Sequence, residues 1–459
     1  MDQLIRRHGK WAGKVKGAAA VLSAALVLEA VIPLDAFAST HSVAVQKIGP
    51  NTSLTMTEWN WETVADDPNY AAILPQLIKG FEAMYPHIKV VNTSMSLEEQ
   101  TDKLPLDFAS ASSTPVVSQT NEGFGSMGRL VADKELLPLN GYDKLYNWSA
   151  RVGRLPIQTQ SFSSNGVNYG VGDVYGVPDN GVVVGVFYNK QILASVGAKP
   201  PTSWATFDQD LAMVKKAGKV ALSFGGGQPT EYQPEHQFQF LLDEFVPAKQ
   251  LTDWIYHIGA NPTIDTAGAI KAAETYVSWA KDGYFNPGYQ GTSVTQALNL
   301  FDTGKTAFFI EGNWHVGAVH SALGPKAGFW VPPEATGSVD EGWSIPARST
   351  DPNAAAAWIN WVLSPQAQAL QLKAGDIPVT ALSAKALDTV PPIAQAAATG
   401  WKQLVNANQL VTFMDWAAPP LLNDIAADVG ELLAGQTSPK SMISSLQSDY
   451  SSWASTHYK

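Results

Sequence analysis

Tryptophans that stand beside carboxylates and amides follow the predicted strands of this chain. The alternating stretch 54–57 predicts a strand and leads into Trp59, Asn60 and Trp61. An indole face stacks well on the apolar C–H face of a pyranose ring, while amides and carboxylates bond to its hydroxyls. Because ligands of open α/β sheets bind beyond the carboxyl ends of strands, this pattern favours a sugar site that at least one of the two indoles faces.

Trp314 has a comparable position after another predicted strand. It follows a predicted strand at 308–310, and Gly312 allows the chain to turn sharply between them. The alternative is a core position, which is the commoner one for tryptophan. For Glu122, a solvated loop position is equally compatible with the sequence. The other candidates stand near predicted strand ends, turns or loops: Asp179, Asn180, Glu231, Tyr232, Glu311, Trp343, Asp415 and Trp416.

The stretch 174–208 would position much of this site. Its run 182–188 is rich in β-branched residues and apolar at both odd and even positions. This pattern predicts a strand buried on both faces and favours a parallel sheet. Ser203 is a suitable N-cap for a helix that follows it.

Further helices are predicted around the site. Apolar residues recur at helical spacing over 73–81 and 270–280. Asp351 and Pro352 predict the start of another helix, with Asp351 as N-cap and proline in the first turn. Trp358 and Trp361 of that helix would share its apolar face, so we expect both in the core rather than in a site.

Five separated motifs resemble one family, the carbohydrate-binding solute receptors of ABC importers. They are Tyr-Gly-Val-Pro with the strand after it (175–190), FEAMYPHIKV (81–90), FDTGKTAFFIEGNW (301–314), AAAAWINWVLSPQAQ (354–368) and LLAGQTSPKSMISSLQ (432–447). The chain departs from the family pattern at Val116 and Phe308. The resemblance implies that Trp314 is a stacking platform and that Asp415 and Trp416 contact ligand.

The same resemblance implies an α/β fold of two lobes, the type II periplasmic-binding-protein fold. Each lobe would hold a mixed, mostly parallel sheet flanked by helices, with the ligand cleft at the hinge. We expect a signal peptide at 1–38, a first lobe from 39–179 and 346–389, and a second from 183–342 and 392–459. The hinge crossings would lie near 180–183, 342–346 and 389–392.

Composition supports a globular, exported protein. The 459 residues exceed one ordinary domain, and the mean hydropathy of −0.06 argues against a polytopic membrane protein. The chain has 30 basic and 41 acidic residues, and no basic run follows Lys16, so nucleic acid is an unfavourable partner. Three glycines at 225–227 are not followed by the Gly-Lys-Ser/Thr of a phosphate-binding loop. No cofactor or metal is expected.

The N-terminus has the pattern of a signal peptide. A basic segment up to Lys16 precedes an apolar run at 17–28, and Ala36-Phe37-Ala38 is a suitable cleavage site. An uncleaved anchor is the minority alternative. Since the chain has no cysteine, a lipobox anchor is excluded, and we expect an extracytoplasmic protein that is not a lipoprotein.

The sequence leaves three functions open. The first is a monomeric receptor, without enzymatic activity, that binds a mono- or oligosaccharide and delivers it to the permease subunits of an ABC importer. A secreted glycoside hydrolase would need two carboxylates about 5 to 10 Å apart, and the acids near the predicted cleft do not exclude it. The third function keeps the fold and binds a non-sugar solute.

Overall fold

The computed structural model describes residues 43–61, 63, 67–227, 232–339, 341–381 and 383–458. The chain divides into two compact units, Met1–Ala44 and Val45–Lys459, and every element named below belongs to the second unit. The predicted signal peptide at 1–38 lies outside the described residues. No helix of the described part of the chain combines the length and apolar character that crossing a membrane requires.

One sheet is built mainly from the first third of the chain. Its strand order is β2-β1-β3-β12-β6, and β1 runs parallel to both β2 and β3, while β12 is antiparallel to β3 and β6. These strands are β1 (Leu54–Asn60), β2 (Ile88–Ser94), β3 (Val117–Thr120), β6 (Gly176–Val177) and β12 (Gly342–Ser344). The polar residues that follow β1 and β3 therefore leave the sheet at the same edge.

The helix α1 (Pro68–Met84) connects β1 to β2. Asp67 caps it by accepting a hydrogen bond from the Tyr70 N–H (2.9 Å), and Pro68 occupies the first turn, where no N–H donor is needed. Its buried residues include Leu74, Leu77 and Phe81, which confirms the helical spacing predicted for 73–81.

The second sheet is centred on the long strand β7 (Asn180–Asn189). Its order is β14-β11-β7-β9-β8, and β10 and β13 also pair with β7. The remaining strands of this sheet are β8 (Val220–Ser223), β9 (Thr306–Gly312), β10 (Ala327–Trp330), β11 (Ala335–Val339), β13 (Ile377–Pro378) and β14 (Leu410–Val411). Burial of β7 on both faces is confirmed, because all of its residues except Tyr188 are buried.

The expectation that β7 belongs to a parallel arrangement is wrong. It pairs antiparallel with β9, β10, β11 and β13, whereas β8–β9 and β11–β14 are the parallel pairs of this sheet. The physical reason is that a continuous apolar run indicates a strand buried on both faces, but it does not specify whether the neighbouring strands are parallel or antiparallel. Both sheets are mixed, as predicted, but neither is mostly parallel, because β12 is antiparallel to β3 and β6 in the first sheet and β7 is antiparallel to its neighbours in the second.

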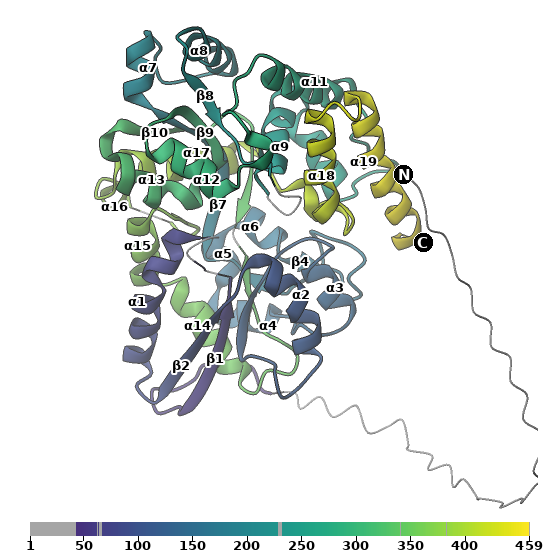
Figure 1. Ribbon diagram of the computed structural model, residues 1–459. Helices are drawn as coiled ribbons and strands as arrows, with labels where there is room; N and C mark the ends of the chain where they lie inside the picture. The colour runs from purple at the N-terminus through teal and green to yellow at the C-terminus, as the bar shows by residue number, and fades with distance from the viewer. Residues whose placement is uncertain are drawn as a thin grey trace, which may run out of the picture. The chain divides into compact units, whose positions relative to one another are not determined.

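Helices surround the two sheets (Figure 1), and α18 and α19 lie beside α9 and α11. The helix predicted from Asp351 is α14, capped by Asp351 accepting from the Ala354 N–H (2.9 Å), with Trp358 and Trp361 both in the core as predicted. The α-helices not yet given bounds, together with the short strands β4 and β5, are α2 (Leu97–Phe108), α3 (Met127–Ala132), α4 (Asn140–Tyr146), α5 (Trp148–Val152), α6 (Arg154–Gln158), β4 (Ser161–Phe162), β5 (Asp173–Val174), α7 (Lys190–Val196), α8 (Trp204–Lys216), α9 (Gln233–Phe245), α10 (Ala248–Ile255), α11 (Ala267–Lys281), α12 (Val294–Asp302), α13 (Val316–Leu323), α14 (Pro352–Val362), α15 (Pro365–Ala374), α16 (Ala384–Leu387), α17 (Pro392–Ala407), α18 (Leu421–Leu433) and α19 (Pro439–His457).

The chain passes between these two sheets three times among the described residues, and the last change, between Ser344 and Ile377, includes helices α14 and α15. It leaves the first sheet after Val177 and enters the second at Asn180, and it returns between Val339 and Gly342. The lobes and hinge crossings expected from the sequence remain a prediction. β13 comes from the stretch expected in the first lobe, yet it pairs with β7 of the second sheet.

Candidate functional site

Glu58 and Asn60 at the end of β1 are both fully buried. Residues of β1 alternate in burial, so these two side chains share one face and Trp59, which is partly buried, takes the other. Asn60 Nδ2 donates to Glu58 Oε1 at 2.6 Å. The next residue, Trp61, is buried and its backbone N–H donates to Gln119 Oε1 at the end of β3 (3.2 Å).

The Glu58 carboxyl is neutral over much of the physiological pH range. Burial raises its pKa to about 8, the bonds from Asn60 and Asn92 act in the opposite direction, and the nearby Asp179 raises it further. Glu58 Oε2 has no hydrogen-bond partner within the described part of the chain. A neutral carboxyl can donate as well as accept, which suits it to a hydroxyl group.

Asp179 lies where the chain passes from the first sheet to the second. Its Oδ2 accepts bonds from Tyr70 OH and Gln371 Nε2, each at 2.7 Å, and its carbonyl accepts from Gln368 Nε2 at 2.6 Å. Helices α1 and α15 thus hold it in one position. Asn180 next to it is buried and begins β7. We call Glu58, Asn60, Trp61 and Asp179 the first cluster.

Glu122 occupies the loop after β3 and is buried, so it is no solvated loop residue. Gln160 Nε2 donates to its Oε1, and the Glu122 N–H donates to Asn121 Oδ1 at 2.8 Å. The same loop meets the other half of the molecule, because the Phe124 N–H donates to the Trp416 carbonyl at 3.2 Å. Glu122 and Trp416 are therefore brought near each other although they are far apart in sequence.

A second group of acids comes from three elements around the second sheet. The N–H of Asp415, on the short helix η5 (Met414–Ala417), donates to Glu235 Oε1 of α9 at 3.3 Å. Burial raises the pKa of Asp415 to about 6, and it raises that of Glu235 well above its usual range, with the neighbouring Asp415 adding to the effect. The two carboxyls therefore share protons near neutral pH.

Glu311, at the end of β9, joins this group through a histidine. His236 Nδ1 of α9 lies 2.7 Å from Glu311 Oε1. The ring of His236 lies 5.5 Å from that of Trp314 and 5.5 Å from that of Phe413. We call Glu235, His236, Glu311, Trp314 and Asp415 the second cluster.

Trp416 and Tyr232 flank the second cluster. The ring of Trp416 lies 5.4 Å from that of Phe413, and the ring of Tyr232 lies 6.2 Å from that of His236. His315 is buried close by, and its pKa falls to about 4 chiefly because burial disfavours the charged ring. Glu231, which the sequence also proposed, lies outside the described residues.

Gly123 allows the loop after β3 to approach Trp416 closely. Its φ is +75°, a value that favours glycine, and a Cβ added there would lie 2.6 Å from Trp416 Cα. Any larger residue would push the loop and η5 apart. The sequence did not single out this position.

Trp343 requires a correction, because the structure places it in the core rather than with either cluster. It lies in the middle of β12, is fully buried and packs edge-on against Trp358 at 5.6 Å between ring centroids. The physical reason is that a residue in the middle of a paired strand, with a helix packed over it, has no free face for a ligand.

Glu235 and His236 were missed as site residues, and Gln160 was too. The sequence alone gives no clear signal for the first two, because α9 carries polar side chains on every side and only the structure shows that the helix is almost wholly buried. Its buried polar residues are Gln233, Glu235, His236, Gln237, Gln239 and Asp243. A buried helix with this composition has to satisfy its polar groups with partners or ligand.

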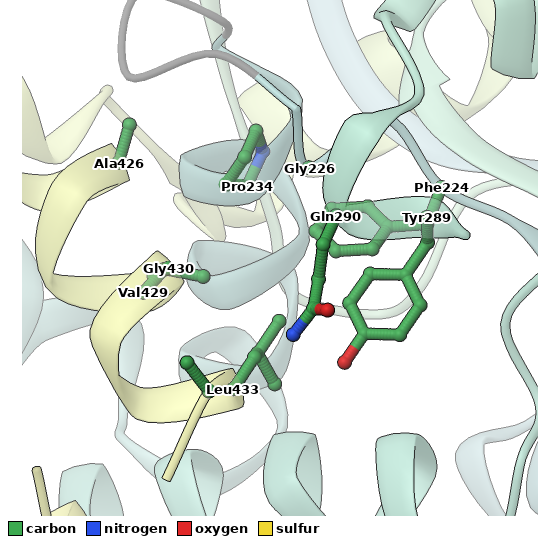
Figure 2. A pocket seen from close by; sticks show the side chains of 10 residues that line it. Phe224, Gly226, Pro234, Tyr289, Gln290, Ala426, Val429, Gly430 and Leu433 are labelled. Carbon is green, nitrogen blue, oxygen red and sulfur yellow. The ribbon is translucent and has the colours of Figure 1, made fainter. Parts of the chain in front are cut away.

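A separate hollow of about 290 Å³ lies beside α18. Figure 2 shows side chains of α18 on one side of it and Tyr289 and Gln290 on the other. Its lining is mainly apolar and includes Pro234, the residue before Glu235, but none of the residues predicted from the sequence. Among the described residues, no group of three or more His, Asp or Glu could hold a metal ion.

Comparison with known proteins places the chain among binding proteins. An uncharacterised ABC transporter extracellular-binding protein of Pyrococcus horikoshii is 24% identical over 343 residues, which are 70% of this chain and 71% of that protein. Proteins of Brucella abortus and Brucella suis are 27% identical over 140 residues, or 30% of this chain. That match spans about a third of their length, 32%.

Solved structures share the fold. A chitin oligosaccharide binding protein has a TM-score of 0.72 at 19% identity, over 89% of this chain and all of the other. The GacH receptor of Streptomyces glaucescens has a TM-score of 0.70 at 19% identity, over 88% of this chain and 99% of the other. A solute-binding protein in complex with raffinose has a TM-score of 0.68 at 16% identity, over 88% of this chain and 100% of the other. These likenesses confirm the predicted two-lobed α/β fold. Residues 65–369 match the family described as bacterial extracellular solute-binding protein, and the chain belongs to that family.

Proposed function

We propose that this protein is an extracytoplasmic receptor that binds an oligosaccharide between its two lobes and delivers it to an ABC importer. The observation that carries the proposal is the pair of clusters. Each combines buried carboxyls with an indole, and they follow strands of two different sheets. Membership of the solute-binding family supports the receptor role. The similar structures named for chitin oligosaccharide and raffinose support a sugar as the ligand.

The chemistry of both clusters fits a sugar. Glu58 and the Glu235–Asp415 pair can donate or accept hydrogen bonds to hydroxyls, since each is protonated over part of the neutral pH range. Trp61 and Trp314 supply indole rings for stacking, which contributes on the order of 1 kcal/mol for each ring. Closure of the lobes around the ligand would exclude water from these bonds and present the closed form to the permease.

The proposal includes the processing and state of the protein. The signal peptide would be cleaved near Ala38, leaving a monomer outside the cytoplasm without a lipid anchor. The hollow beside α18 begins at Pro234, next to Glu235, and would give room for further units of an oligosaccharide.

A screen of the chain from Ser39 onward tests the proposal. Thermal shift and tryptophan fluorescence would be measured against neutral and amino mono- and oligosaccharides, and every hit would be assayed for released reducing ends. Saturable stabilisation with intact sugar is the expected result. Turnover would favour a glycoside hydrolase. No response to any sugar would favour a non-sugar solute on the same fold.

A further inference from the structure

The buried charged residues of the described part of this protein are predominantly acidic. Among the described residues, the buried ionisable side chains are acids, tyrosines and the two histidines His236 and His315, with no lysine or arginine. The internal positions outside the described ranges contain no lysine or arginine either. A neutral-sugar site can balance its carboxylates with basic side chains, and here none is buried with them.

The second cluster concentrates this imbalance. Glu235, Glu311 and Asp415 are all buried, and Glu311 and Asp415 both raise the pKa of Glu235 after burial itself. Two histidines lie near these acids. They are His236, whose Nδ1 lies 2.7 Å from Glu311 Oε1, and His315, which burial keeps neutral by lowering its pKa to about 4. No lysine or arginine is buried with them in the described part of the chain.

Two further observations point to a ligand here. Glu311 is 2% exposed, and its Oε2 has no hydrogen-bond partner among the described residues. A chain of aromatic rings also surrounds the cluster, because His236 contacts the rings of Tyr232, Trp314 and Phe413. Carboxylates together with aromatic rings are the groups that recognise an ammonium ion.

We propose that the second cluster binds the ammonium group of an amino sugar, so that the ligand is a saccharide with a free 2-amino-2-deoxyhexose unit. This inference rests on the proposed receptor function and specifies its substrate class. The ammonium supplies the positive charge that the protein lacks, between Glu235, Glu311 and Asp415 and beside Trp314. A neutral sugar leaves Glu235 and Asp415, whose pKa values burial raises, in their protonated forms, whereas the ammonium favours their ionised forms.

Proton release therefore accompanies the binding of an amino sugar. The titratable groups around the site include Glu235 and His236 of α9, Glu311 of β9, His315 of η3 (Asn313–His315), Asp415 of η5, Tyr276 of α11, Glu122 of the loop after β3, and Tyr169. Tyr169 stays protonated because burial raises its pKa, and His315 stays neutral. Glu235 and Asp415 are the groups that lose a proton when the cation enters.

The test compares sugars that differ only at C2. Titration calorimetry at pH 6.5 would use glucose, glucosamine and N-acetylglucosamine, their β-1,4-linked oligomers, and the galactose and galactosamine pair. We expect the best amino sugar to bind about tenfold or more tightly than its neutral counterparts, because hydrogen bonds to charged groups are stronger than those between neutral groups. Repeating the titration in buffers of different ionisation enthalpy should show release of about one proton with the amino sugar alone.

Two isosteric variants assign the effect to the cluster. Glu235→Gln and Asp415→Asn should reduce the ratio of amino-sugar to neutral-sugar affinity by at least about fivefold and abolish the proton release. Asp243→Asn is the matched control, because Asp243 is a buried acid of the same helix α9 whose Oδ2 accepts from Thr336 N and Oγ1. Asp243→Asn should leave unchanged both the ratio of amino-sugar to neutral-sugar affinity and the number of protons released on binding.

The outcomes separate this inference from the receptor function. If a neutral or N-acetylated sugar binds as tightly as every amino sugar, the amino-sugar inference is wrong and the receptor stands. If an amino sugar is preferred but both variants keep the preference, the assignment to this cluster is wrong. If no sugar of either kind binds, the proposed function as a sugar receptor is wrong, and the amino-sugar inference that rests on it is wrong as well.

Discussion

The two clusters differ in how their carboxyl groups are held. Asp179 of the first cluster accepts bonds from Tyr70 and Gln371, and Asn60 donates to Glu58. In the second cluster, carboxyls lie against one another and against aromatic rings, with His236 as partner of Glu311. Neutral amide and hydroxyl donors thus hold the carboxyls of the first cluster in position before a ligand binds. No lysine or arginine side chain is buried with the carboxyls of the second cluster in the described part of the chain. We expect substitutions in the first to cost stability and those in the second to cost binding.

The largest effect is expected at Asp179. Asp179→Ala removes the acceptor of Tyr70 OH and Gln371 Nε2 in a buried site, and each donor left unbonded costs about 1 to 3 kcal/mol. The free energy of unfolding should fall by about 3 kcal/mol in denaturant titrations. Asp179→Asn keeps one acceptor oxygen and should lose less. Equal stability of Asp179→Ala and the parent protein would show that the first cluster is not held in this way.

The second effect is expected at Trp314, where binding rather than folding should suffer. Trp314→Ala removes a partly buried indole from the second cluster, and sugar affinity should fall at least about tenfold. The matched control is Trp343→Ala, which creates a core cavity and should cost about 3 to 5 kcal/mol of stability. Unchanged affinity of Trp314→Ala would remove Trp314 from the site.

A third substitution addresses the contact between the two halves. Gly123→Ala places a Cβ 2.6 Å from Trp416 Cα and should weaken ligand binding about fivefold or more, because the closed arrangement is strained. Gly218→Ala is the control, since Gly218 has a φ of +73° and open space around its missing Cβ. Both variants share the backbone cost of about 1 kcal/mol. Equal affinities of the two variants would mean that closure does not depend on this contact.

The smallest effect is expected from the Glu58 carboxyl, seen in the pH dependence of stability. Its folded pKa of about 8 lies above the ordinary value of 4.5, so the folded state binds more protons between these values. Stability therefore decreases as pH rises from about 4.5 to 8, and it is unaffected by this group below 4.5. Glu58→Gln should flatten that decrease by about 1 to 3 °C in melting temperature, measured by calorimetry. An unchanged profile would show that Glu58 is solvated in the folded protein.

The sequence predicted the elements better than their pairing. The caps at Asp351 and Ser203, and the apolar face of α1, follow from local chemistry and are confirmed. The direction of β7 could not be predicted, because its neighbours come from as far along the chain as β13 and its own residues only report burial. Local pattern specifies an element, whereas pairing depends on residues far away.

The candidate residues show the same limit. Asn60, Glu311 and Trp314 lie at or just past strand ends, where the sequence placed them, and Glu58 of the same strand as Asn60 was not among the candidates. Trp343 has the same local appearance as Trp314, but the helix α14 covers it. Glu235 and His236 escaped notice because α9 packs between other elements, and burial of a helix with polar residues on every side becomes visible only in three dimensions.

A crystal structure of the protein with the tightest saccharide from the screen tests the central claim most directly. We predict one intact saccharide between the clusters, with hydroxyls bonded to Glu58 or Asn60, a ring on Trp314, and the amino group within bonding distance of Glu235, Glu311 or Asp415. A saccharide bound in the hollow beside α18 or on the outer surface, with both clusters left as they are, would contradict this account.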